Sequence, residues 1–195
     1  AAEGRLVSSG NGPSTMSAVA TILGKDLRVE LRTLQSIPAM VLFSTTIYVI
    51  FRFGLDRTQL DGGLATGVLL VTILFAALLA INRLFVAERE QGGFEAVRLA
   101  PVDGTALFLA KALALLVYLT ILELVAVPVF WLFFLGSGSG LLPMLPVLLL
   151  LNGALACTGA LISPIATNST ARDLIGPLIL LPLLVPPMVA ASAAG

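Results

Sequence analysis

The side chains that could do chemistry in this sequence lie in two places. Glu123 stands inside an apolar run, and a dense group of charges falls between residues 88 and 98. The chain has no histidine, and its one cysteine is Cys157. Because no nucleophile–base pair and no pair of intramembrane carboxylates can be assembled, the sequence indicates neither a catalytic site nor a metal or cofactor site.

Glu123 is the more costly of the two features, because a carboxylate inside a lipid bilayer is expensive and suggests a function by default. It lies in the run LTILELVAVP. Three roles fit this position: facing a substrate path, pairing with Lys111 or a partner subunit, or staying protonated and hydrogen-bonded between helices. We treat Glu123 as a candidate intramembrane polar site and leave these roles open.

The second feature is the stretch 82–104, NRLFVAEREQGGFEAVRLAPVDGT. Charges surround Glu88, two glycines interrupt the chain, and an apolar edge precedes Pro101. A short helix with apolar anchors and flanking charges suits a groove on a soluble partner, and a solvated loop with a surface helix is the alternative. The candidate contact residues are Arg83, Phe85, Glu88, Gly92, Phe94, Glu95, Val97 and Leu99.

The composition indicates that these features belong to a membrane protein. Hydrophobic residues make up 58% of the chain and charged residues only 11%, whereas soluble domains are about 45–50% apolar and about 25% charged. The formal net charge is zero, so there is no basic excess for nucleic acid. Lipid is therefore the expected surrounding of this chain.

Five apolar segments approach the roughly 20 residues that a helix needs to cross a bilayer. They predict an all-α, polytopic transmembrane bundle, because the runs are continuous and lack the alternation of membrane strands. The first segment is short, the third is long and contains Pro128, and the fifth has four prolines that predict a bent or broken helix. The segments cover about 38–53, 64–81, 107–135, 141–163 and 174–193.

An amphipathic helix is predicted before the first span, over residues 18–35. Its apolar positions recur at helical spacing and its charges lie in the run KDLRVELR, so we expect it along the membrane interface, as an anchor or a docking element. Residues 1–15 are small and polar, which predicts a disordered or non-native tail before Met16. The membrane domain is expected to cover 16–195.

Lysine and arginine distribution predicts the orientation. Most of these residues lie before the first span, around the 82–104 stretch and at Arg172, whereas Arg52 and Arg57 lie on the other side. The N-terminus is therefore predicted to be cytoplasmic. Small residues also predict close helix contacts, at Gly63-x-x-x-Gly67 and along residues 153–160, either within the bundle or at a homodimer seam.

The long polar stretch resembles a known family. The pattern Arg83-Leu84-Phe85, Glu88, Gly92, Glu95, Leu99, Pro101 and Lys111 looks like the haem exporter B family, and the early KDLRVELR run is similar to that family's entry helix. These proteins are the permease subunits of the ABC-type system for cytochrome c maturation. Broader ABC-2-type permeases share the general order of acidic residue, glycine and acidic residue.

The resemblance implies a six-helix permease in the bacterial inner membrane, so a sixth span would be missing here. It implies partnership with a separate ATPase that binds ATP, with haem-handling membrane proteins, and with haem as the possible substrate. The 82–104 stretch would dock on the ATPase through Glu88, Gly92 and Glu95. The alternatives are an ABC-2-type permease for a lipid or drug, and a membrane scaffold that transports nothing.

Overall fold

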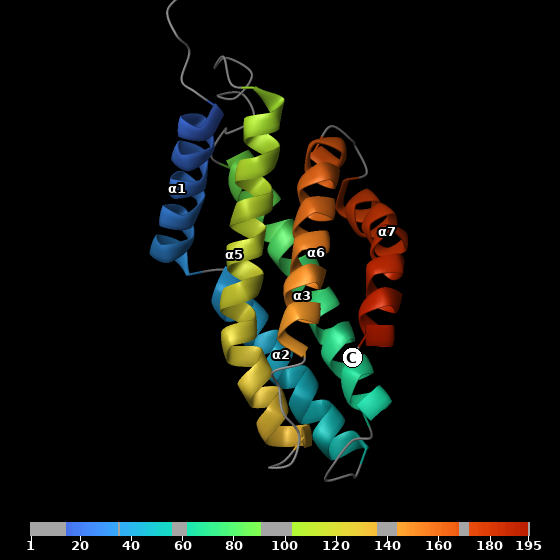
Figure 1. Cartoon of the computed structure of the whole chain (residues 1–195). Helices are drawn as coiled ribbons and strands as arrows, with labels where there is room; N and C mark the ends of the chain where they lie inside the picture. Colours follow the sequence, from blue (N-terminus) through green and yellow to red (C-terminus); the bar gives the residue numbers. More distant parts are fainter. Residues whose placement is uncertain are drawn as a thin grey trace, which may run out of the picture.

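The computed structural model describes residues 15–34, 36–55, 62–90, 103–135, 144–167 and 172–194. Their regular structure is entirely helical over these ranges, which confirms the predicted all-α bundle (Figure 1). The helices are α1 Thr15–Thr33, α2 Ser36–Gly54, α3 Gly62–Glu90, α5 Gly104–Phe130 with its π-helical continuation η1 Trp131–Leu135, α6 Met144–Thr167 and α7 Arg172–Ala194.

Four of the helices are long and apolar enough to cross a membrane by length and composition. They cover Ser36–Gly54, Gly63–Leu84, Gly104–Phe134 and Met144–Ile162. In α7, the apolar part within the described structure is Pro182–Ala193, which is shorter. The polytopic bundle is thus confirmed, while the described residues contain four full-length spans and one shorter apolar helix where five spans were predicted.

The helices place three separate parts of the chain at the same end of the bundle. The start of α1, the end of α3 and the start of α5 lie together there, beside the end of α6 and the start of α7 (Figure 1). The distribution of positive residues assigns two of these places, the 82–104 stretch and Arg172 at the start of α7, to one side of the membrane. Which side of the membrane this end of the bundle faces stays a prediction.

α3 is longer than predicted, because it continues to Glu90 instead of ending at the start of the 82–104 stretch. Residues 82–90 are thus helical, and residues 91–102 lie outside the described structure. The side chain of Asp103 accepts a hydrogen bond from the backbone N–H of Thr105 at 3.4 Å, which begins α5 with an N-cap.

Proline has different effects in the two helices where it was expected to matter. Pro128 lies near the end of α5, and the helix changes there into η1, a wider turn of the kind that accommodates a missing N–H. In α7 the expected break does not occur, because the helix runs continuously from Arg172 to Ala194. Membrane bundles tolerate such prolines when neighbouring groups satisfy the released carbonyls.

The glycines of α6 and α3 divide into open and crowded positions. A Cβ atom added at Gly63, Gly67 or Gly153 would meet nothing within 4 Å, so the small-residue patterns expected to mark close contacts do not make them at these glycines in the described chain. At Gly159, by contrast, a Cβ would lie 2.7 Å from Ile81 Cδ1 and 3.0 Å from Leu115 Cδ1. Gly159 is therefore where α6 closely approaches α3 and α5.

Gly159→Leu should destabilise the bundle by at least about 1–3 kcal/mol, because Ile81 and Leu115 are buried and cannot move aside freely. The matched change Gly153→Leu, on the same helix, should have little effect because the space there is open. Thermal unfolding of the two purified variants in detergent measures the difference. Equal stability of both variants would contradict this assignment of the close contact.

Candidate functional site

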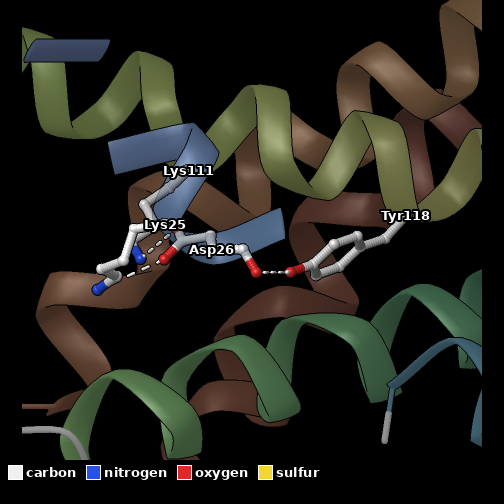
Figure 2. Close-up of polar contacts among 4 residues, drawn as sticks. All are labelled: Lys25, Asp26, Lys111 and Tyr118. Carbon is white, nitrogen blue, oxygen red and sulfur yellow. Dashed lines mark hydrogen bonds and ion pairs between the residues drawn. The ribbon is translucent and has the colours of Figure 1, made fainter. Parts of the chain in front are cut away.

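A buried ion pair joins α1 to α5 near the end of the bundle that holds residues 82–90 and the start of α5. We call residues 82–104, which are expected to dock on the ATPase, the coupling stretch. Lys111 Nζ lies 2.7 Å from Asp26 Oδ2, and both side chains are almost fully buried, at 6% and 5% exposure (Figure 2). Lys25 Nζ approaches the other carboxylate oxygen at 3.5 Å, and the Tyr118 hydroxyl donates to the Asp26 carbonyl at 3.3 Å. Asp26 is thus bound through both its side chain and its backbone.

Glu30, one turn after Asp26, joins α1 to α2. One of its carboxylate oxygens accepts hydrogen bonds from the backbone N–H groups of Ser36 at 2.8 Å and Ile37 at 3.0 Å. These are free donors at the start of α2, where a negative charge is favourable. Leu34 adopts a left-handed conformation at φ 47° and donates its N–H to the Glu30 carbonyl at 2.7 Å, which ends α1.

The predicted amphipathic helix is α1, but the sequence did not predict which of its charged side chains would be buried. Its buried positions are Val19, Asp26 and Glu30, so both carboxylates face the bundle. Val19 packs against Ala106 and Ala110 of α5. Because α1 runs lengthwise against α5, it belongs to the packed bundle, whereas its position at the membrane interface stays a prediction.

Some of the predicted coupling residues lie within the described structure and others lie outside it. Arg83 lies exposed on the last turns of α3, and Phe85 and Glu88 follow on the same helix, at positions whose side chains are not described. Gly92, Phe94, Glu95, Val97 and Leu99 lie outside the described residues. The structure therefore places the two ends of this stretch side by side, and its docking role stays a prediction.

Glu123 lies in the middle of α5, and its carboxylate oxygen Oε1 is buried without a hydrogen-bond partner. Lys111, considered as its partner from the sequence, is twelve residues earlier on the same helix, about 18 Å along the axis. Lys111 is bound to Asp26 instead. The pairing of Glu123 with Lys111 is therefore wrong, while the other roles stay open.

The sequence did not identify Asp26, Glu30 and Tyr118 as site residues. A signal was present, because Asp26 and Glu30 are four residues apart and seven or more after Val19, so they share the face that contains an apolar position. Charged residues on the buried face of an amphipathic helix require partners. Lys111, inside the third apolar segment, was the available cation.

Comparison with known proteins supports the resemblance seen in the loop. The family model described as CcmB protein matches residues 17–195. The chain is 26% identical over 169 residues to the heme exporter protein B of Rhodobacter capsulatus, covering 86% of this chain and 78% of the relative. It is 29% identical over 164 residues to the heme exporter protein B of Bradyrhizobium diazoefficiens, covering 83% and 65% respectively.

A third relative, the heme exporter protein B of Pseudomonas aeruginosa, is 27% identical over 175 residues, covering 89% of this chain and 78% of the relative. No solved structure matches the chain significantly. The family match extends over almost the whole chain and includes both α1 and the coupling stretch. On this evidence the chain belongs to the CcmB protein family.

Proposed function

We propose that this chain is the permease subunit of an ABC transporter that exports haem, or passes it to partner proteins, during cytochrome c maturation. The supporting observation is the family match over residues 17–195, together with relatives named heme exporter protein B. The apolar helices supply a membrane pathway in the bacterial inner membrane, with the N-terminus in the cytoplasm. The sequence contains no G-x-x-x-x-G-K-[ST] run, so ATP hydrolysis is assigned to a separate subunit.

The bundle supports a coupling role for the segment between α3 and α5. This segment joins two helices whose ends lie at the same end of the molecule (Figure 1). α5 is bound to α1 by the Asp26–Lys111 ion pair. When ATP closes the partner dimer, a displacement of the docked segment would therefore move α5 and α1 together, because packed helices shift as rigid elements.

The further partners follow from the same family assignment. Haem is proposed as the substrate, and its iron ligands are not assigned to this chain. Other cytochrome c maturation membrane proteins would receive it, and a second permease copy would complete the transporter. Gly63 and Gly67 on α3, which have open space around them within this chain, are compatible with a helix of the second copy.

The test is co-purification of the full-length protein with the candidate ATPase subunit. In the Glu88→Lys, Glu95→Lys double variant we expect recovery of the complex to fall at least about tenfold, about 1.4 kcal/mol in binding free energy. The cause is that two acidic groups that fix the docking register become like charges facing a basic groove. The permease-dependent part of the ATPase rate and the cellular content of c-type cytochromes should fall in parallel.

The matched control is Glu88→Asp, Glu95→Asp, which keeps both charges and should keep the complex. Size-exclusion chromatography shows whether each variant remains folded. Equal recovery of the ATPase with the Lys and Asp variants would refute the coupling assignment. Cells that lack this chain should fail to mature c-type cytochromes. If they matured them normally, although the chain binds the ATPase, the haem-transport proposal would be refuted.

A further inference from the structure

Four polar side chains from four helices meet inside the membrane-spanning part of the bundle. They are Tyr48 of α2, Thr72 of α3, Glu123 of α5 and Asn152 of α6. Glu123 faces the amide of Asn152 and lies within electrostatic range of Tyr48, whose hydroxyl in turn faces Thr72. We call these four residues the intramembrane polar cluster, and only Glu123 was evident from the sequence.

Three of the four residues are buried and Glu123 is partly exposed, yet several polar atoms lack the hydrogen bonds that burial requires. Tyr48 and Asn152 are both 0% exposed. The Tyr48 hydroxyl, Glu123 Oε1 and both amide atoms of Asn152 have no hydrogen-bond partner in the described chain. The Thr72 hydroxyl, by contrast, donates to the Val68 carbonyl at 2.7 Å. Because unpaired polar groups are costly in a membrane interior, another group is expected to pair with them.

The chemistry of the unpaired atoms indicates what this group is. Asn152 offers two N–H donors and one acceptor, Tyr48 offers a hydroxyl, and Glu123 offers an acceptor oxygen. Water both donates and accepts, and a buried water usually forms about three hydrogen bonds.

The charge of Glu123 must also be balanced. From α1, the acidic residues Asp26 and Glu30 lie near Tyr118, which is five residues from Glu123, or about 7.5 Å along α5. From α2, the titratable groups are Tyr48 and, one turn further on, Arg52; α3 and α6 contribute the neutral Thr72 and Asn152, and η1 has no titratable group. No ion pair joins Glu123 to these described residues, so a bound proton is the simplest neutralising group.

We propose that the intramembrane polar cluster is a proton-binding site, in which Glu123 holds a proton and buried water links its carboxyl group to Tyr48 and Asn152. The proton enters and leaves as a hydrated proton, so the carboxyl group alternates between neutral and charged forms without any other reactant. This inference needs neither haem nor ATP. It therefore stands or fails independently of the proposed transport function.

The test is infrared difference spectroscopy of the full-length protein in lipid nanodiscs at neutral pH, in H₂O and D₂O. The wild type should show the carbonyl band of a protonated carboxyl group, shifted in D₂O. The band should disappear in Glu123→Gln and remain in the control Asp103→Asn, which removes an exposed carboxylate outside the cluster. In Asn152→Leu and Tyr48→Phe the band should move to higher frequency, because hydrogen bonds to the carboxyl group are lost.

The last two variants retain Glu123, so they keep the test decisive even if Glu123→Gln fails to fold. Absence of the band in the wild type would overturn the proposal, because Glu123 would then be ionised, balanced by Arg52 or another cation. A band that appears only after sodium is removed would also overturn it and indicate a sodium site. A band unaffected by Asn152→Leu and Tyr48→Phe would show that the carboxyl group is isolated. It would overturn the proposal that water links Glu123 to Tyr48 and Asn152.

Discussion

Lys111→Met should lower the free energy of unfolding by about 3–5 kcal/mol, because it leaves a buried carboxylate without its closest cation. Asp26 is 5% exposed and lies 2.7 Å from Lys111, whereas its second cation, Lys25, is 3.5 Å away and 43% exposed. A partly exposed lysine at that distance compensates weakly. Chemical unfolding of the purified variant in detergent measures the loss.

Two controls separate the buried charge from the loss of side-chain volume. Asp26→Leu combined with Lys111→Met replaces both charges by apolar groups, and its stability should return close to that of the wild type. Lys25→Met should cost under about 1 kcal/mol. If the double variant were as unstable as Lys111→Met alone, packing and not the unpaired charge would explain the effect.

Phe130→Ala should produce the second large effect, a loosened packing of α2 against α5. The ring of Phe130 lies 5.4 Å from Tyr48 and 5.2 Å from Phe134, measured between ring centroids, and all three side chains are buried. In a soluble core this truncation costs about 3–5 kcal/mol. Lipid removes the transfer part of that cost, because acyl chains are as apolar as the core, and we expect about 2 kcal/mol from lost packing.

The matched control is Phe53→Ala on α2, where the side chain is 80% exposed and should contribute little. A cysteine pair across α2 and α5, cross-linked in membranes, would report whether the packing of α2 against α5 loosens in the Phe130 variant. Unchanged cross-linking together with unchanged unfolding would contradict the role of this aromatic contact. The same measurement on Phe134→Ala should give an intermediate loss, because Phe134 also contacts Tyr48, at 6.1 Å.

Much of the fold followed from local sequence properties. The apolar runs around residues 64–81 and 107–135 correspond to α3 and α5, and the amphipathic period before residue 35 corresponds to α1. For α7 a bent or broken helix was predicted, and the break was wrong, because proline propensity is local whereas helix continuity in a bundle depends on neighbouring helices. The end of α3 at Glu90 was missed for a related reason: the charges after Asn82 do not by themselves end a helix.

Some of the functional features were also evident from the sequence, and others were not. Glu123 stood out because a carboxylate in an apolar run is unusual, and the coupling stretch stood out because it resembles a family. Asp26 was missed because its partner, Lys111, is 85 residues away and the helical period alone does not say which face meets which helix. The unpaired state of Tyr48 and Asn152 was equally invisible, since both are ordinary residues of a membrane helix until their neighbours are known.

The amino-acid sequence alone was enough to identify a helical membrane protein of a recognisable family, because hydrophobic length, charge placement and motif spacing are properties of consecutive residues. Only the tertiary structure decided that Asp26 and Lys111 pair, that Gly159 is the close contact, and that Glu123 meets Asn152 and Tyr48. These outcomes depend on the rotation of each helix about its own axis. That rotation is set by the packing of all the helices together, and no single segment encodes it.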